Sequence, residues 1–528
     1  MSHQRERCTR SFRMGFRLIL LAVLAVCVSS KITTWKDKKS GCSYNDYGWK
    51  KFIDCHGLYL EKMPTIDLPA KYKDDVLDEI DVSYNNIEFL GANVFSGLPK
   101  AKFINLEHNF INKIDDKAFE GFADVTERLA MDHNRFDSFP FGIFHLKSLK
   151  DLGLSFNNIS YNATDDLRLT SEPVRKLEKL TLKGNPLKQF WNNWKFGNDL
   201  IKLDLSATFM NGFPMTVQYF SKLEYLDFSY QDFPWSGMVT RALNKLKTLK
   251  TLHLRGVGLE EIPPLVLEGL DHLSVEFNKI ATIEKDTFQG LSKLKELALD
   301  CNPLKNVDRK AFTPFRKSLE YLSMVDCNYP NAPALLAPLQ KLRELHLANN
   351  SISELKQYNL GNLAHLHHLN MDQNEFTAIP QGIHLLTDLT ILSLVENKIT
   401  KIRRGAFDDM AYLKEVHLAE NDLQGLKGHV FFNLDREISV NVIHNKIEKI
   451  DICLLYSNVE YVVLFENPIQ CDCGAYWVMK EGLIYEPYLT CKGGKGMKGL
   501  TFTEMVTYVE ENDMCPVEDK EDQLSYCV

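Results

Sequence analysis

The sequence lacks the motifs by which most enzyme classes are recognised. It contains no G-x-S-x-G, no H-E-x-x-H and no glycine-rich phosphate loop, the patterns that position a nucleophile, a catalytic zinc ion or a nucleotide. No pair of carboxylates stands out that would suit hydrolysis of a polysaccharide. We therefore expect no enzymatic activity, no cofactor and no metal site.

Long apolar runs and excess positive charge are also missing. After the first thirty residues no stretch is apolar enough to cross a bilayer, which takes about 20 consecutive residues. Residues 510–528 are polar and acidic and have no hydrophobic tail of the kind that directs a lipid anchor. The chain has 62 Lys and Arg against 70 Asp and Glu, and an acidic chain argues against nucleic acid as the main partner.

Residues 1–30 are predicted to be a secretory signal peptide. Five arginines precede an apolar run from Leu18 to Val28, and Val28 and Ser30 are small enough for the positions before a cleavage site. The alternative is an uncleaved signal anchor, but the run is much shorter than a spanning helix. We expect a secreted, extracellular protein without stable membrane insertion.

A short motif repeats at fixed phase through most of the chain. Residues 389–402 read L-x-x-L-x-L-x-x-N-x-I-x-x-I, and Phe407 follows ten residues after Asn397. The alternation at Leu392 and Leu394 predicts a short strand with both side chains buried. The Asn amide can bond the backbone where the chain turns away from the strand. One such unit cannot bury its apolar side alone, so it requires neighbours.

The motif recurs about seventeen times with a mean period of about 24 residues. The Asn position falls at Asn85, Asn109, Asn134, Asn157, Asn185, Thr208, Gln231, Val257, Asn278, Asn302, Cys327, Asn350, Asn374, Asn397, Asn421, Asn445 and Asn467. The Phe recurs at Phe95, Phe119, Phe144, Phe288, Phe312, Phe407 and Phe431. Residues 77–470 therefore resemble the extracellular, typical leucine-rich repeat family. The resemblance implies an α/β repeat solenoid, a curved horseshoe with a concave parallel β-sheet and loops or short helices on its convex side.

The same resemblance implies a cysteine-bridged cap after the repeats, in residues 471–528, which end in an acidic tail. In the family the first cysteine of this cap pairs with the third and the second with the fourth, which gives Cys471–Cys491 and Cys473–Cys515. A Cys-x-Cys metal site is the alternative, but residues 445–528 contain no His, and an oxidising secretory route favours disulfides.

The family also places a cap before the repeats, here residues 31–76. It usually carries four cysteines, and this sequence has two, so we expect a reduced cap with one Cys42–Cys55 bridge. Of the other cysteines, Cys301 and Cys327 lie in successive repeats, where a bridge and buried free thiols are both open.

Cys453 and Cys527 also have two alternatives. Cys527 either folds back to Cys453 or stays an exposed thiol that links two chains. The second alternative would give a disulfide-linked dimer, whereas the first leaves a monomer or a non-covalent dimer.

Three N-glycosylation sequons stand at Asn158, Asn162 and Asn349. The first two follow the fourth strand on its connecting loop, and the third lies at the exit of the twelfth. We expect sugars at these positions to lie outside the concave sheet.

The residues that flank the strand leucines are expected to line the concave sheet. Candidate ligand-binding residues there are Lys179, Lys183, Lys202, Tyr225, His253, Arg255, His272, Tyr321 and His346. Charged and aromatic side chains on a rigid platform are typical of protein-binding surfaces, although a solvated face has a similar composition. Outward histidines would titrate and make binding pH-sensitive, and plain polar surface is the other interpretation. His365, His367 and His368 crowd one repeat, but their spacing suits neither a strand face nor a helix face, so we assign no metal there.

We expect a secreted, non-enzymatic binding protein that recognises a protein or a cell-surface or microbial glycoconjugate through the concave face. The family includes Toll-type receptors, adhesion proteins and soluble immune factors, and fold resemblance does not choose among them. Immune recognition or cell adhesion is the favoured role. The alternative is an extracellular-matrix protein that self-associates through the concave sheet or through Cys527.

Overall fold

The computed structural model describes residues 33–162, 176–191, 198–356, 360–484, 486 and 489–527. The chain divides into two compact units, Met1–Leu259 with Leu265–Asn278 and Glu260–Pro264 with Lys279–Val528, and each is described by itself. The predicted signal peptide lies outside the described residues.

The first unit begins with a small antiparallel cap and continues as a parallel β-solenoid. In the cap, β1 (Thr33–Lys36), β2 (Ser43–Asp46) and β3 (Lys51–Asp54) are antiparallel, and β3 pairs in parallel with β4 (Val76–Asp81). The sheet then takes one strand per repeat: β6 (Lys100–Asn105), β8 (Arg128–Ala130), β9 (Asp151–Gly153), β10 (Lys179–Thr181), β11 (Lys202–Asp204), β12 (Tyr225–Asp227), β13 (Thr251–His253) and β14 (His272–Ser274). The connecting segments contain α2 (Ala70–Lys73), β5 (Phe89–Leu90), β7 (Lys113–Ile114), the 3₁₀ helices η1 (Phe141–His145) and η3 (Met215–Tyr219), and α4 (Gly237–Leu243).

The second unit continues the same pattern and ends in a helical cap. Its strands are β16 (Glu296–Ala298), β18 (Tyr321–Ser323), β19 (Glu344–His346), β20 (His368–Asn370), β21 (Ile391–Ser393), β22 (Glu415–His417), β23 (Ile438–Asn441) and β24 (Val459–Val463). The connecting segments contain β15 (Thr282–Ile283), β17 (Asn306–Val307), η4 (Thr313–Phe315), η5 (Ala332–Leu335), η6 (Ile383–Leu385), η7 (Gly428–Val430) and η8 (Ile452–Tyr456). The cap helices are α6 (Cys473–Lys480), α7 (Phe502–Glu511) and α8 (Val517–Ser525).

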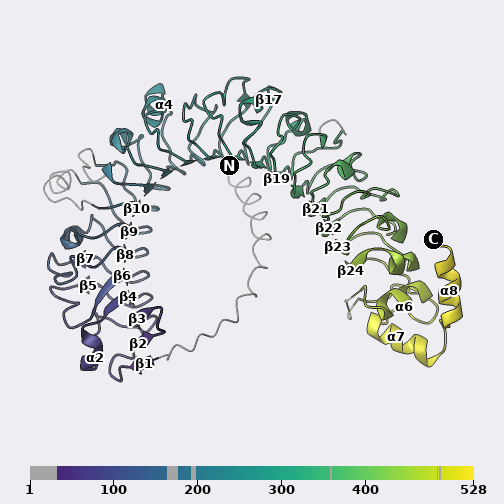
Figure 1. Cartoon of the computed structure of the whole chain (residues 1–528), viewed down its shortest axis with the longest axis horizontal. Helices are drawn as coiled ribbons and strands as arrows, with labels where there is room; N and C mark the ends of the chain where they lie inside the picture. The colour runs from purple at the N-terminus through teal and green to yellow at the C-terminus, as the bar shows by residue number, and fades with distance from the viewer. Residues whose placement is uncertain are drawn as a thin grey trace. The chain divides into compact units, whose positions relative to one another are not determined.

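The predicted fold class and repeat register are confirmed in both units. The strand leucines Leu152, Leu252, Leu345 and Leu392 are at most 1% exposed, and every residue at the repeated Asn position is buried. The repeated Phe is buried too, apart from Phe144, which is half-buried. Within each unit the strands lie on the inner side of the array and the connecting segments on the outer side (Figure 1). We call the solvent-facing side of these strands the inner face.

A ladder of buried asparagines joins successive repeats. Asn397 Nδ2 donates to the carbonyl of Met371 in the preceding repeat at 3.0 Å and to that of Leu394 in its own repeat at 3.1 Å. Its Oδ1 accepts from the backbone nitrogen of Phe376 at 3.0 Å. A buried backbone group without a partner costs about 1–3 kcal/mol, so the amide at this position makes the turn compatible with burial.

Where the Asn is replaced, other side chains take over part of its bonding. Gln231 Nε2 donates to the carbonyl of Leu205 at 2.6 Å, and its Oε1 accepts from Met210 N at 2.9 Å. Thr208 donates to the same carbonyl at 2.7 Å.

The thiol of Cys327 occupies the Asn position of its repeat. It lies 3.4 Å from the carbonyl of Leu299 in the preceding repeat, and burial raises its pKa, which keeps it protonated as a weak donor. Cys327 is a buried free cysteine. The sequence left a bridge between Cys301 and Cys327 open. This bridge is not formed, because the Cys327 thiol points to backbone carbonyls, as the ladder asparagines do.

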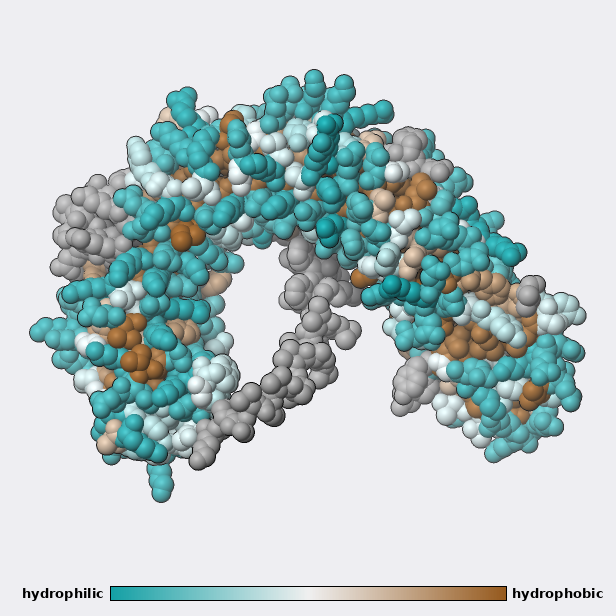
Figure 2. Space-filling view, in the orientation of Figure 1, coloured by the Kyte–Doolittle hydropathy of each residue, from teal (hydrophilic) through white to brown (hydrophobic). Residues whose placement is uncertain are grey.

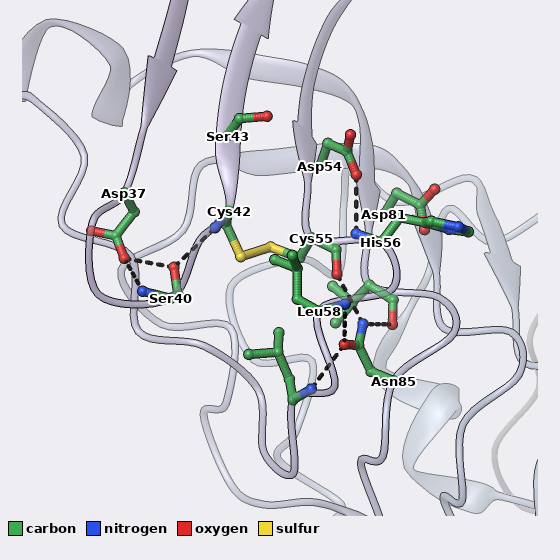
Figure 3. The surroundings of a disulfide bond; sticks show 12 residues. Asp37, Ser40, Cys42, Ser43, Asp54, Cys55, His56, Leu58, Asp81 and Asn85 are labelled. Carbon is green, nitrogen blue, oxygen red and sulfur yellow. Dashed lines mark hydrogen bonds between the residues drawn. A yellow bond between two sulfur atoms is a disulfide. The ribbon is translucent and has the colours of Figure 1, made fainter.

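The N-terminal cap is joined to the first repeat by covalent and hydrogen bonds. Cys42 and Cys55 form a disulfide, as the resemblance implies, and the first ladder residue, Asn85, donates to the carbonyl of Cys55 at 2.9 Å (Figure 3). Asn85 Oδ1 accepts from Leu58 N at 3.0 Å. On β2, Tyr44 donates to Asp75 at 2.6 Å. The first strand of the solenoid is thus covered rather than left with an open edge.

The C-terminal cap covers the other end of the solenoid. Its disulfides join Cys471 to Cys491 and Cys473 to Cys515, the pairing that the resemblance implies. Phe502, Met505 and Trp477 are buried in the helical layer. The helix α7 begins at a capping box, in which Thr501 and Glu504 bond each other's backbone nitrogens, a strong N-terminal signal.

The C-terminal residues differ from the acidic tail expected from the sequence. Residues 517–525 form the helix α8, and Cys527 is bonded to Cys453 of η8. The alternative in which Cys527 links two chains is therefore wrong. The fold brings Cys527 back onto the connecting segment of the repeat that contains Asn445, which local sequence does not reveal.

Both units present a largely hydrophilic face in the space-filling view (Figure 2). This follows from the repeat pattern, in which leucines fill the interior while polar residues flank them on the strands. In the part of the chain that the structure describes, no helix is long and apolar enough to cross a membrane.

Candidate ligand-binding face

Strand pairing in the first unit places most of the predicted binding residues side by side. The first inner-face position of each strand aligns in one row, in which Lys179, Lys202, Tyr225, Thr251 and His272 are successive partners. Adjacent strands lie about 4.8 Å apart. Residues about one repeat apart in sequence therefore form a continuous strip.

Ring contacts connect the residues of this strip. The Lys202 ammonium lies 4.6 Å from the ring centroid of Tyr225, within the range of a cation–π contact. The Tyr225 ring is 5.3 Å from His253, and His253 is 4.9 Å from His272. These contacts hold the aromatic side chains in place on the sheet.

Arg255 completes the cluster two positions beyond the end of β13. Its Nε donates to Ser274 Oγ at 2.7 Å and lies 3.5 Å from Glu276 Oε1, while Nη2 lies 3.1 Å from His253 Nδ1. Ser274 also donates to Glu276. The guanidinium is therefore oriented before any ligand arrives, which lowers the entropic cost of binding.

Burial on the sheet shifts the pKa of Tyr225, of His253 and of Asp227, the last residue of β12. Burial, reinforced by Asp227, raises the pKa of Tyr225, and burial with neighbouring Asp204 raises the pKa of Asp227. Burial, followed by the positive charge of Arg255, lowers the pKa of His253 to about 3. His253 is thus neutral at physiological pH.

His253 differs from its expected role as an outward surface residue. It is 7% exposed, because Arg255, Tyr225 and His272 cover it. Its ring packs beneath the side chains of Tyr225, His272 and Arg255 and is not exposed to a ligand.

The two remaining predicted lysines lie on the N-terminal side of this cluster. Lys179 is exposed, 3.9 Å from Asp151. Lys183 is exposed, with its ammonium 5.6 Å from the ring of Phe156. Both are available to a partner of negative charge.

Tyr321 and His346 belong to the second unit and form a separate group there. Their rings are 5.3 Å apart, and His346 lies 5.0 Å from His368. A hydrogen bond from His346 lowers the pKa of Glu344 against the effect of burial. Burial, with His346 next, lowers the pKa of His368.

The sequence prediction missed two residues of the first cluster, Ser274 and Glu276. Both occupy inner-face positions of the same repeat, directly beside Arg255. The signal was present in the register, since Glu276 stands one repeat after Arg255 at the corresponding position. Sequence alone does not distinguish Glu276 from an exposed acid beside a strand, because its burial depends on the side chains around it.

The three predicted glycosylation sites lie on connecting segments, away from the strands. Asn158 and Asn162 are exposed. Asn349 is half-buried, and its Nδ2, the atom that would carry a sugar, donates to Asp326 at 2.8 Å. Modification of all three remains a prediction, and the geometry favours the first two.

Comparison with known proteins agrees with this architecture. The leucine rich repeat model matches residues 75–134, 268–328, 340–398 and 387–447. Osteomodulin of Rattus norvegicus is 26% identical over 329 residues, which are 61% of this chain and 62% of osteomodulin. Lumican of Rattus norvegicus is 29% identical over 235 residues, 39% of this chain and 67% of lumican. The chain thus spans about six tenths of the length of the relative osteomodulin.

The fold is also found among solved structures. The Drosophila Toll–Spatzle complex contains a chain that superposes with a TM-score of 0.62 at 15% identity, over 88% of this chain and 72% of that one. At this identity the likeness shows the fold alone. Together with the repeat register, the asparagine ladder and the bridged caps, these matches show that the chain belongs to the leucine-rich repeat family.

Proposed function

We propose that this is a secreted, non-enzymatic binding protein that recognises a protein ligand through the inner face of its first unit. The observation that carries the proposal is the preorganised strip of Lys202, Tyr225, His272 and Arg255. Tyrosine and arginine in fixed positions are enriched among residues that dominate binding energy. The exposed Lys179 and Lys183 extend the strip with positive charge, which suits a ligand surface of negative charge.

Two further findings support an extracellular binding role. The four disulfides that close the caps persist in oxidising compartments. The structurally similar Toll chain was solved in a complex with Spatzle, an instance of this fold engaging a protein. A cell-surface or microbial glycoconjugate with acidic groups is the other ligand class that the same charges would accept.

The test is affinity capture of partners from extracellular fluid and cell surfaces, using the mature secreted chain. Combined Lys179→Glu, Lys183→Glu and Lys202→Glu reversals should lower capture of the specific partner at least 10-fold, because they oppose the charge of its surface. Lys147→Glu, a reversal on an exposed connecting segment of the same unit, should leave capture unchanged. If the triple variant retains every partner, this face is not the binding surface.

The captured partner also decides between roles. A microbial molecule would indicate immune recognition, and a host cell-surface protein would indicate adhesion. Binding of glycan fragments after protease treatment would identify a glycoconjugate.

Self-association in the extracellular matrix is the second candidate. Tyr461 and Phe465, on and just after β24, are 43% and 47% exposed, and aromatic surface of this kind marks contact sites. Such an assembly would be non-covalent, because Cys527 is already bonded within the chain. Light scattering across a concentration series should show a dimer that Phe465→Ser abolishes, and a monomer throughout would remove this candidate.

A further inference from the structure

Three side chains with metal-binding atoms meet on two adjacent strands of the second unit. Glu344 and His346 flank the buried Leu345 on β19, and His368 begins β20, where the register places it opposite Glu344. One ligand atom from each of the three lies within 4.8 Å of the other two. His346 Nε2 is 3.8 Å from Glu344 Oε2, and the imidazole rings of His346 and His368 are 5.0 Å apart.

We propose that Glu344, His346 and His368 bind a divalent transition metal of the zinc class on the inner face of the second unit. Two imidazole nitrogens and one carboxylate form a ligand set that Zn²⁺ takes where a fourth position is left open. Zinc can bind this set without thiolate ligands. The set does not suit Ca²⁺ or Mg²⁺, because these ions prefer oxygen ligands and two of the three ligand atoms are nitrogens.

The distances suit closure around an ion. Ligand atoms about 2.0–2.1 Å from a tetrahedral zinc lie about 3.3 Å from one another. The three atoms must therefore approach by about 1.5 Å at most, which rotation of the side chains supplies without moving the strands. The Glu344 side chain is 51% exposed, so its carboxylate has room to turn towards the two rings.

The backbone beneath the site is rigid. Leu345 and Leu369 are fully buried and paired across β19 and β20, so the three Cα positions are fixed. The ring of Tyr321 lies 5.3 Å from that of His346, so the exposed Glu344 is the ligand with most room to turn. Preorganised ligands of this kind raise metal affinity, since less conformational entropy is lost on binding.

Neighbouring histidines do not reproduce the arrangement. His365 lies 3.0 Å from Asp388 and His417 lies 3.0 Å from Glu415, and in the described part of the chain neither pair has a third ligand atom within reach. Among the residues that the structure describes, Glu344, His346 and His368 are the group in which three such ligands converge. The open coordination position faces the space in front of the sheet, where water or a carboxylate of a bound partner completes the shell.

The test is metal titration of the full secreted chain, purified without a polyhistidine tag and stripped of metal by a chelator. Calorimetry with Zn²⁺ should show one site per chain, and Co²⁺ should give the visible absorption of a tetrahedral nitrogen–oxygen site. His346→Gln and His368→Gln should each weaken binding at least 100-fold, and Glu344→Gln at least 10-fold. Mg²⁺ and Ca²⁺ should not compete.

His365→Gln is the matched control, since it removes a histidine with a carboxylate partner from the same repeat as His368. It should leave affinity and stoichiometry unchanged. All four variants alter solvent-facing positions, and equal thermal unfolding midpoints without metal would show that the fold is intact. The proposal is overturned if no stoichiometric binding occurs, or if binding survives both His346→Gln and His368→Gln.

Discussion

Arg255 donates a hydrogen bond from Nη2 to Nδ1 of His253, at 3.1 Å. A guanidinium can only donate, so Nδ1 accepts and the proton of the neutral imidazole is on Nε2. Protonation of Nδ1 would break this bond and set two positive charges against each other. The pair therefore couples the protonation state of one buried ring to the integrity of the proposed binding strip.

Acidification should destabilise the first unit through His253. Its pKa is lowered to about 3 in the fold, by burial and then by Arg255, His272 and Lys202, while an unfolded histidine titrates near about 6.5. Between these values the unfolded chain binds one more proton. Stability should therefore be complete above about pH 6.5 and fall by up to about 1.4 kcal/mol for each pH unit below it.

Urea unfolding between pH 7 and pH 5 measures this dependence. His253→Gln keeps an acceptor for Arg255 but cannot titrate, so its stability should depend less steeply on pH. His365→Gln, which alters an exposed histidine, should behave like the unaltered chain. An unchanged slope in His253→Gln would show that another group is responsible.

The asparagine ladder should be essential to stability. Asn397→Ala leaves the carbonyls of Met371 and Leu394 and the nitrogen of Phe376 without their side-chain partner in a buried turn. We expect a loss of about 2–4 kcal/mol, since each orphaned group costs about 1–3 kcal/mol and the turn can relax in part. Asn362→Ala, which removes one exposed bond to Ala337, should cost less than about 1 kcal/mol. Equal thermal midpoints for the two variants would contradict this role.

Two glycines in one repeat should respond differently to alanine. A Cβ at Gly428 would lie 2.5 Å from the backbone nitrogen of Leu454, and closer still to the carbonyl group of Cys453. A Cβ at Gly425 would meet no atom within 4 Å. Gly428→Ala should therefore push η8 away from η7 and cost about 1–3 kcal/mol, whereas Gly425→Ala should be neutral or slightly stabilising. Chemical unfolding of the two variants tests the packing of the last repeats, and equal stabilities would refute it.

The Cys453–Cys527 bridge should hold α8 on the solenoid. The bridge closes a loop with a sequence separation of 74, for which loop entropy predicts about 4 kcal/mol. Besides the bridge, α8 is held by its buried Leu524 and by Lys520, which donates to Glu481 at 2.7 Å and lies 4.8 Å from the centroid of the Trp477 ring. These contacts are weaker than a covalent link. Cys453→Ser with Cys527→Ser should expose Lys520 to rapid cleavage by trypsin while the repeats stay intact.

Cys327→Ser is the control for this experiment, since it removes a thiol that forms no bridge. In Cys327→Ser, α8 should be as resistant to trypsin as it is in the unaltered chain. The unaltered chain should also run as a monomer in non-reducing electrophoresis. A covalent dimer that disappears on reduction would contradict the intramolecular bridge.

Repetition explains why so much of the fold could be predicted. Leu392 is one of many leucines at the same position of the repeat, so the prediction that it is buried did not depend on its local sequence alone. The terminal bridges at Cys471 and Cys473 could be assigned because the family shares their spacing. By contrast, Gln231 and Cys327 fill the Asn position with other chemistry, and only the folded structure shows that each bonds the carbonyl that an Asn would bond in the preceding repeat.

The geometry of the proposed binding face was predicted less completely. The inner-face positions of Tyr225 and Arg255 follow from the register alone. The burial of His253 does not, because it depends on how three neighbouring side chains fold over it. Tyr321 and His346 lie in the second unit, where they form a group of their own.

By itself the sequence determined that the repeated leucines and asparagines are buried and in what order the repeats stack, because a motif of fixed period leaves one way to hide its leucines. Only the tertiary structure decided which side chains become neighbours. Parallel pairing brings together residues about one repeat apart, so His368 meets Glu344 and His346 and not the histidines beside it in sequence. Likewise, the packing of α8 against η8 brings Cys527 to Cys453, 74 positions earlier in the sequence, a contact that no local pattern encodes.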